Sequence, residues 1–257
     1  MLRQTLESLG FVTATLCLWA ALAPRLSPSL GTAMAAFSVA TAAILGGVTL
    51  APFRSAPPRA RDTLANLALG LVAVAGSFVS GSLVPSVAGS LGVIFIGVAV
   101  GHAVGARMQH AAHLTPVALV SAAVDLWSVT SPHGPTHTIV RNPALLRLLT
   151  VSVAPPGGGD PLPAIGFGDA AFVALYLSAA SRFRVSKPKM LACLGAGLVG
   201  SCAVAIGLGR PVPALPLMGA AVVLLTPEAR AIRAEDRAAT GFAALLLAAS
   251  VARALTR

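Results

Sequence analysis

The stretch PAIGFGDAAFVAL, residues 163–175, contains a single charged residue, Asp169, in a run that otherwise carries no charge. An ionised side chain deep in a membrane is costly, so such an acid is neutralised, paired or functional. The run belongs to one of nine apolar segments, which lie at 9–23, 29–51, 63–84, 87–106, 115–131, 161–180, 189–208, 212–226 and 239–254. Several have roughly the 20 residues that a membrane-spanning helix requires. The sequence therefore predicts an all-α fold, a polytopic transmembrane bundle of about nine helices.

The composition supports a membrane protein. Of the 257 residues, 56% are apolar and only 10% are charged, whereas soluble proteins carry about 25% charged residues. The net charge of +10 comes from basic residues scattered singly or in small groups between the apolar runs, as in the loops of membrane proteins. We expect a lipid bilayer as the environment and no nucleic-acid partner, because no continuous basic stripe is present.

Topology and origin follow from the same residues. If the nine segments alternate in direction, twelve basic residues collect on one side and six on the other, which favours a cytoplasmic N-terminus. Arg outnumbers Lys sixteen to two, which we interpret as a sign of a GC-rich genome and of a prokaryotic cytoplasmic membrane. We expect one integral membrane domain over 1–257, with N-terminal helices in 1–112, a core in 115–226 and an additional helix at 239–254.

Two acids stand apart from the other six. Asp125 and Asp169 lie within apolar segments, whereas the rest lie at the termini or in connecting loops. Asp125 is six residues before the end of 115–131. Asp169 is seven or eight residues after the start of 161–180, which the pair Asp160 and Pro161 marks as a helix start. At 1.5 Å per residue, both acids are predicted to lie roughly 10 Å below the same membrane face.

Because the two segments are consecutive, their helices should run antiparallel and bring the carboxyl groups together. Two carboxyl groups held a few ångströms apart share one proton. One can then activate water while the other protonates a peptide carbonyl. The structural alternative is that each aspartate bonds separately to a Ser, Thr or backbone group.

Two short motifs accompany the acids. Gly166, Phe167 and Gly168 precede Asp169 directly, and glycines allow another backbone to approach closely. Pro213, Ala214, Leu215 and Pro216 form a second motif at the start of 212–226. Its prolines lack amide hydrogens and leave backbone groups free at membrane depth, which is tolerated only beside protein or a water-filled cavity.

These motifs resemble those of the presenilin and signal peptide peptidase family of intramembrane aspartyl proteases, which carry Gly-x-Gly-Asp and Pro-Ala-Leu-Pro. The resemblance covers residues 115–226, and the first catalytic motif is partial, since Val124 replaces the usual tyrosine before Asp125. It implies that Asp125 and Asp169 are the catalytic dyad, that Gly166, Phe167 and Gly168 shape the active site, and that residues 213–216 position the substrate. The implied substrates are transmembrane helices or signal-peptide remnants.

Other functions stay open at this point. The same two acids would suit a proton- or ion-coupled transporter, and the Val124 departure would suit an inactive protease-like scaffold. The three cysteines have no spacing typical of zinc, so we expect no metal centre and no organic cofactor. Accessory subunits and the oligomeric state are not indicated.

Overall fold

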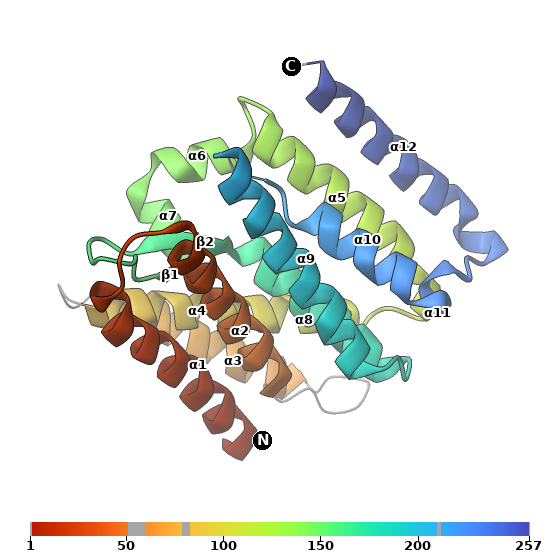
Figure 1. Cartoon of the computed structure of the whole chain (residues 1–257). Coiled ribbons are helices and arrows are strands. Elements are labelled where there is room, and N and C mark those ends of the chain that lie inside the picture. Colours follow the sequence, from red (N-terminus) through yellow and green to blue (C-terminus); the bar gives the residue numbers. More distant parts are fainter. Residues whose placement is uncertain (1, 51–59, 79–82, 210–211, 257) are drawn as a thin grey trace. The chain divides into compact units, whose positions relative to one another are not determined.

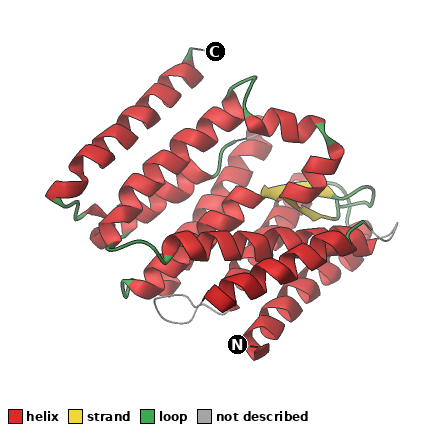
Figure 2. Cartoon of the chain, turned by 180° about the vertical axis from the view of Figure 1, so that it is seen from behind, coloured by secondary structure: helices red, strands yellow, loops and turns green. Residues whose placement is uncertain are grey.

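The computed structural model describes residues 2–50, 60–78, 83–209 and 212–256, and most of them are helical (Figures 1 and 2). The chain divides into two compact units, Met1–Arg107 with Pro143–Ser178, and Met108–Asn142 with Ala179–Arg257. Within the described residues there are twelve α-helices, three short 3₁₀ helices and two strands. Each of the nine predicted apolar segments overlaps one or more of these helices. The expected all-α class is therefore confirmed, and each unit is described by itself below.

The first unit is built from six α-helices, one short 3₁₀ helix and one β-hairpin. Its elements are α1 (Leu2–Leu22), η1 (Ala23–Arg25), α2 (Leu30–Leu50), α3 (Ala60–Gly76), α4 (Leu83–Gly105), α7 (Pro143–Leu149), β1 (Thr150–Val153), β2 (Leu162–Gly166) and most of α8 (Phe167–Arg182). Helix α4 is the most deeply buried, and its Ile94 and Phe95 have no exposed surface. It packs along α3 and against β1.

The second unit places α5 between two other helices. Its elements are η2 (Ala111–His113), α5 (Leu114–Thr130), α6 (Pro135–Arg141), α9 (Lys187–Leu208), α10 (Leu215–Leu225), α11 (Pro227–Arg230), η3 (Ala234–Asp236) and α12 (Arg237–Leu255). Helix α5 packs against both α10 and α12, and α9 contacts α10 (Figure 1). Helix α5 turns residues with small side chains, Ala118, Ser121 and Ala122, toward these neighbours, which allows a close approach of the backbones.

Six of the described helical segments are long and apolar enough to cross a membrane, so the chain is a multi-pass membrane protein. These segments are Gln4–Arg25, Leu30–Thr49, Val87–Gly105, Ala111–Thr130, Lys187–Leu208 and Ala234–Leu255. The remaining three predicted spans form shorter helices: α3 has 17 residues, α8 has 16 and α10 has 11. A helix of 11 residues extends for about 16 Å, about half of the hydrocarbon core.

The β-hairpin corrects the prediction of a helix from residue 161. Strands β1 and β2 pair antiparallel, with Val151 opposite Ile165 and an irregularity after Val151. Pro161 and Pro163 disfavour an early helix start, because proline provides no amide hydrogen. Three glycines with positive φ, Gly157, Gly158 and Gly159, lie in the connection between the strands, where other residues would be strained.

Two long-range contacts hold β1 and the residue after it in the first unit. The Ser90 hydroxyl of α4 donates to the Ser152 carbonyl, 3.2 Å away, and accepts from the Ser152 amide at 3.0 Å. The indole Nε1 of Trp19, on α1, donates to the Ala154 carbonyl at 2.8 Å. The backbone groups of Ser152 that face α4 are thereby satisfied, as burial requires.

Candidate functional site

Asp125 lies five residues before the end of α5, close to its predicted place. It follows the buried Ala118 and Ala122 by seven and three residues, so it lies on the same helix face. This face meets α10, because a Cβ added at Gly219 of α10 would lie 3.1 Å from the Ala118 side chain. The half-buried Asp125 carboxylate therefore points along the seam between α5 and α10.

The Pro213–Pro216 motif forms the start of α10 and contacts Asp125 directly. Leu215 is the first helical residue, and its backbone N–H donates to Asp125 Oδ2 at 3.0 Å. Amides in the first turn of a helix have no partner within the helix, so the carboxylate fills this role for Leu215. Pro216, next in the chain, provides no N–H. The contact joins two predicted motifs that are 90 residues apart in sequence.

Asp169 lies in the first turn of α8, not seven residues inside a helix. Helix α8 begins at Phe167, and the six residues that were predicted to precede it in the helix include strand β2. The Gly166 amide donates to Asp169 Oδ2 at 3.1 Å. Gly166 precedes the helix and Asp169 is its third residue, and a side chain at the third position that accepts from the residue before the helix is typical of a capping box. The argument from equal depth in two helices is therefore wrong for Asp169.

The glycines before Asp169 leave room beside it. A Cβ added at Gly166 would meet only Asp169 Oδ2, at 3.5 Å, and one added at Gly168 would meet no heavy atom within 4 Å. Phe167, between them, is half-buried. Close backbone packing thus does not account for either glycine in the described structure, and the space at Gly168 is open to a side chain or another chain segment.

Close packing occurs instead at glycines that we did not predict. Gly97, Gly101 and Gly105 of α4 lie four residues apart and face α8. A Cβ at Gly101 would overlap the Ala171 carbonyl oxygen, and one at Gly105 would lie 2.8 Å from the Leu175 carbonyl oxygen. The spacing of four, repeated twice, is the sequence signal that predicts such a contact. These glycines fix the helix that carries Asp169.

Each acid therefore has a backbone amide as a neighbour within its own unit. Asp125 belongs to the second unit and Asp169 to the first, and the pairing of their carboxyl groups stays a prediction. A carboxylate oxygen can accept a hydrogen bond from water, and a protonated carboxyl group can donate one to a peptide carbonyl. Each acid is thus positioned for proton transfer as well as for helix capping.

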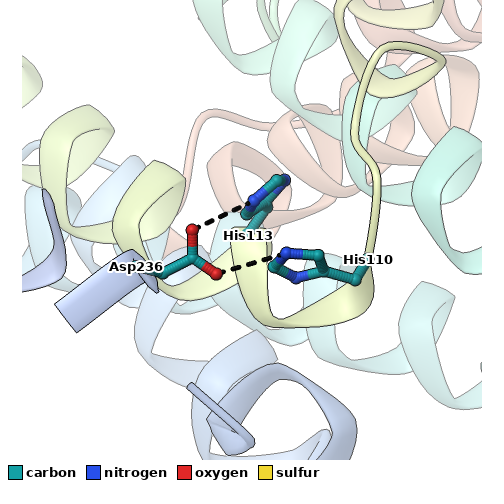
Figure 3. A group of neighbouring side chains, drawn as sticks. All are labelled: His110, His113 and Asp236. Atoms are coloured by element: carbon teal, nitrogen blue, oxygen red, sulfur yellow. Dashed lines mark ion pairs between the residues drawn. The ribbon is translucent and has the colours of Figure 1, made fainter. Parts of the chain in front are cut away.

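A third acid is grouped with two histidines, although we expected no metal centre. His110, His113 and Asp236 place one possible metal-binding atom each within 4.8 Å of one another (Figure 3). The sequence signal was the spacing of three between the histidines, which puts both on one side of a helical turn. Asp236 is 123 residues beyond His113, so only the fold reveals the group.

Comparison with known proteins gave no match: no family model, no curated protein and no solved structure resembles this chain.

Proposed function

We propose that this chain is an intramembrane aspartyl endopeptidase with a presenilin-like fold, working in a prokaryotic cytoplasmic membrane. The observation that carries the proposal is the hydrogen bond from the Leu215 amide to Asp125 Oδ2, 3.0 Å long. It brings the Pro-Ala-Leu-Pro motif against an acid of the membrane helix α5, in the order and spacing that the family resemblance requires. Simple helix capping does not require that motif.

The proposed reaction uses Asp125 and Asp169 as one acid–base pair. The ionised carboxylate takes a proton from water, and the water oxygen attacks the peptide carbon. The other acid, which is protonated, donates its proton to the carbonyl oxygen. The first acid, now protonated, gives its proton to the nitrogen as the C–N bond breaks, and a hydroxyl of the diol intermediate gives its proton to the other carboxylate. The pair is thereby left with one shared proton. This mechanism requires no metal or organic cofactor.

Strand β2 supports the proposal because it leads directly to Asp169. Among the described residues β2 pairs only with β1, so its other edge offers backbone groups to an added strand. A helical substrate must be unwound before its peptide bonds can be attacked, and an extended segment alongside β2 would pass Gly166 and Gly168. The open space at Gly168 would accept its side chains, while residues 213–216 would hold it beside Asp125.

The test is cleavage of a reporter transmembrane helix by the purified chain in lipid vesicles. In Asp125→Asn and Asp169→Asn the amide oxygen still accepts the Leu215 or Gly166 hydrogen bond, but the side chain no longer ionises. General acid–base catalysis contributes roughly 10²–10⁴ in rate, so each variant should lose at least about a hundredfold. Unchanged cleavage in either variant would contradict the proposal.

A second function, an inactive scaffold, is favoured by one observation: each carboxylate already accepts a helix-starting or strand-ending amide hydrogen. Binding of an aspartyl-protease transition-state analogue separates the two functions. A protease binds the analogue and loses this binding in both Asn variants. An inactive scaffold does not bind the analogue, either as the wild type or as an Asn variant. Proton-coupled transport into vesicles that is lost in the same variants, without any peptide product, would instead favour the transporter.

A further inference from the structure

His110, His113 and Asp236, here called the His–Asp cluster, link two segments of the second unit. The histidines flank η2, immediately before α5, and Asp236 ends η3, immediately before α12. His110 Nε2 lies 3.2 Å from Asp236 Oδ2, and His113 Nε2 lies 3.3 Å from Asp236 Oδ1 (Figure 3). The centroids of the imidazole rings lie 3.8 Å apart and the ring planes are tilted by 46°, and each ring presents a nitrogen to the same carboxylate.

These separations match the edge of a zinc coordination tetrahedron. Zinc binds imidazole nitrogen at about 2.0–2.1 Å and carboxylate oxygen at about 2.0–2.2 Å, which places neighbouring ligand atoms of a tetrahedron about 3.3–3.5 Å apart. A direct charge-assisted hydrogen bond is shorter, about 2.7–2.9 Å. Each imidazole nitrogen thus lies at about the spacing of neighbouring zinc ligands from its own oxygen of Asp236, and one such atom from each of the three residues lies within 4.8 Å of the others.

Two buried polar atoms in the cluster make no hydrogen bond to the described residues. They are Asp236 Oδ2 and His110 Nδ1. The side chains of His110 and Asp236 are only 11% and 17% exposed. Leaving a buried carboxylate oxygen without a hydrogen bond costs free energy, and a cation bound to Oδ2 would remove that cost.

The donor set selects the type of ion. Two imidazole nitrogens and one carboxylate oxygen suit Zn²⁺, whereas Ca²⁺ and Mg²⁺ prefer oxygen ligands alone. Glu235 Oε1, 3.9 Å from His110 Nε2, or a water can supply the fourth position. One contact opposes binding through His113 Nε2: the Gln109 amide donates to Nδ1 at 3.4 Å, and this long hydrogen bond has to be given up.

We propose that His110, His113 and Asp236 bind Zn²⁺ and so clasp the start of α12 to the start of α5. His113 and Asp125 are twelve residues apart, about 18 Å along the helix, so the proposed site is separate from Asp125 within the second unit. The inference goes beyond the proposed protease function and does not rest on it. It departs from the expectation, stated in the sequence analysis, that the chain has no metal centre.

The experiment measures zinc bound to the purified full chain in detergent, with any affinity tag removed. After treatment with a chelator and dialysis against buffer containing Zn²⁺, the wild-type chain should retain about one zinc ion, measured by mass spectrometry. Co²⁺ in place of zinc should give the visible absorption of a tetrahedral site. His113→Ala and Asp236→Asn should bind zinc at least about tenfold more weakly, since each removes a ligand. His133→Ala is the matched control, because His133 is exposed and outside the cluster.

Thermal unfolding keeps the test decisive if a variant folds poorly. Zinc should raise the Tm of the wild type and of His133→Ala, because an ion that binds only the folded state stabilises it. It should not raise the Tm of His113→Ala. A wild-type chain that retains no zinc and shows no shift in Tm would overturn the proposal, as would equal zinc content in His113→Ala and His133→Ala.

Discussion

The helices α5 and α8 each carry one of the two candidate acids, but they are held in different ways. Helix α8 is fixed by close backbone contact with the α4 glycines, and Asp169 accepts an amide hydrogen from Gly166, only three residues before it. Helix α5 is fixed to α10, and Asp125 accepts an amide hydrogen from Leu215, which is 90 residues away. A local cap explains Asp169 without any further role, whereas no local rule explains Asp125. Asp125 is therefore the more informative of the two acids.

The largest expected effect on stability tests the glycine contact. Gly101→Val would force a branched side chain into the Ala171 carbonyl oxygen, so α4 and α8 would have to separate. We expect a loss of at least about 3 kcal/mol in the free energy of unfolding, the upper end for overpacking. Gly10→Val is the control, because a Cβ there meets no heavy atom within 4 Å. Denaturant titration in micelles measures the free energy of unfolding of both variants. Equal values for Gly101→Val and Gly10→Val would contradict the conclusion that the α4 glycines fix α8.

The next effect tests the long-range hydrogen bond. Asp125→Ala removes the acceptor of the Leu215 amide and leaves that N–H without a partner, which should cost about 2 kcal/mol. Asp125→Asn keeps an oxygen acceptor and should cost less than half as much. The same titration distinguishes them. If both variants unfold like the wild type, the bond contributes nothing to stability.

A smaller loss is expected at the other acid. Asp169→Ala removes a local cap, typically worth about 1 kcal/mol, and Asp169→Asn should restore most of it by accepting from Gly166. The measurement is again the free energy of unfolding. A loss at Asp169 larger than that at Asp125 would reverse the comparison.

The smallest effect on stability separates packing from function. Gly168→Ala adds a methyl group where no heavy atom lies within 4 Å, so the free energy of unfolding should change by less than about 1 kcal/mol. In the proposed protease the methyl group would narrow the space beside Asp169, and cleavage of the reporter helix should fall about tenfold. Gly10→Ala, which also adds a methyl group within a helix where no heavy atom lies within 4 Å, serves as the control for altered helix propensity. Full activity in Gly168→Ala would remove Gly168 from the active site.

Much of the fold could be predicted from apolar segments alone. Each of the nine segments overlaps a helix, and the bounds of α5 differ from the predicted 115–131 by one residue at each end. Such patterns report local burial, which the amino-acid order carries directly. The family resemblance also implied that residues 213–216 act at the site of the catalytic acids, and the Leu215 amide donates to Asp125.

The errors have a common physical cause, dependence on distant residues. Strand β2 needs β1 as its partner, and β1 lies between the predicted segments 115–131 and 161–180, so the predicted position of Asp169 along its helix was wrong. The His–Asp cluster joins residues more than 120 positions apart. Asp236 was assigned to a solvated loop, yet its side chain is only 17% exposed. Neither the pairing of β1 with β2 nor the grouping of His110, His113 and Asp236 produces a periodic pattern in the sequence.

The hydrogen bond from Trp19 to Ala154 has a consequence for biosynthesis. It links residues 135 positions apart, and a ribosome adds about 5–20 residues each second. The first helix is therefore made roughly 7–27 seconds before the carbonyl that its indole finally meets. During that interval the indole N–H must use a temporary acceptor, such as a lipid headgroup or water, so the N-terminal helix completes its contacts only after half of the polypeptide has been translated.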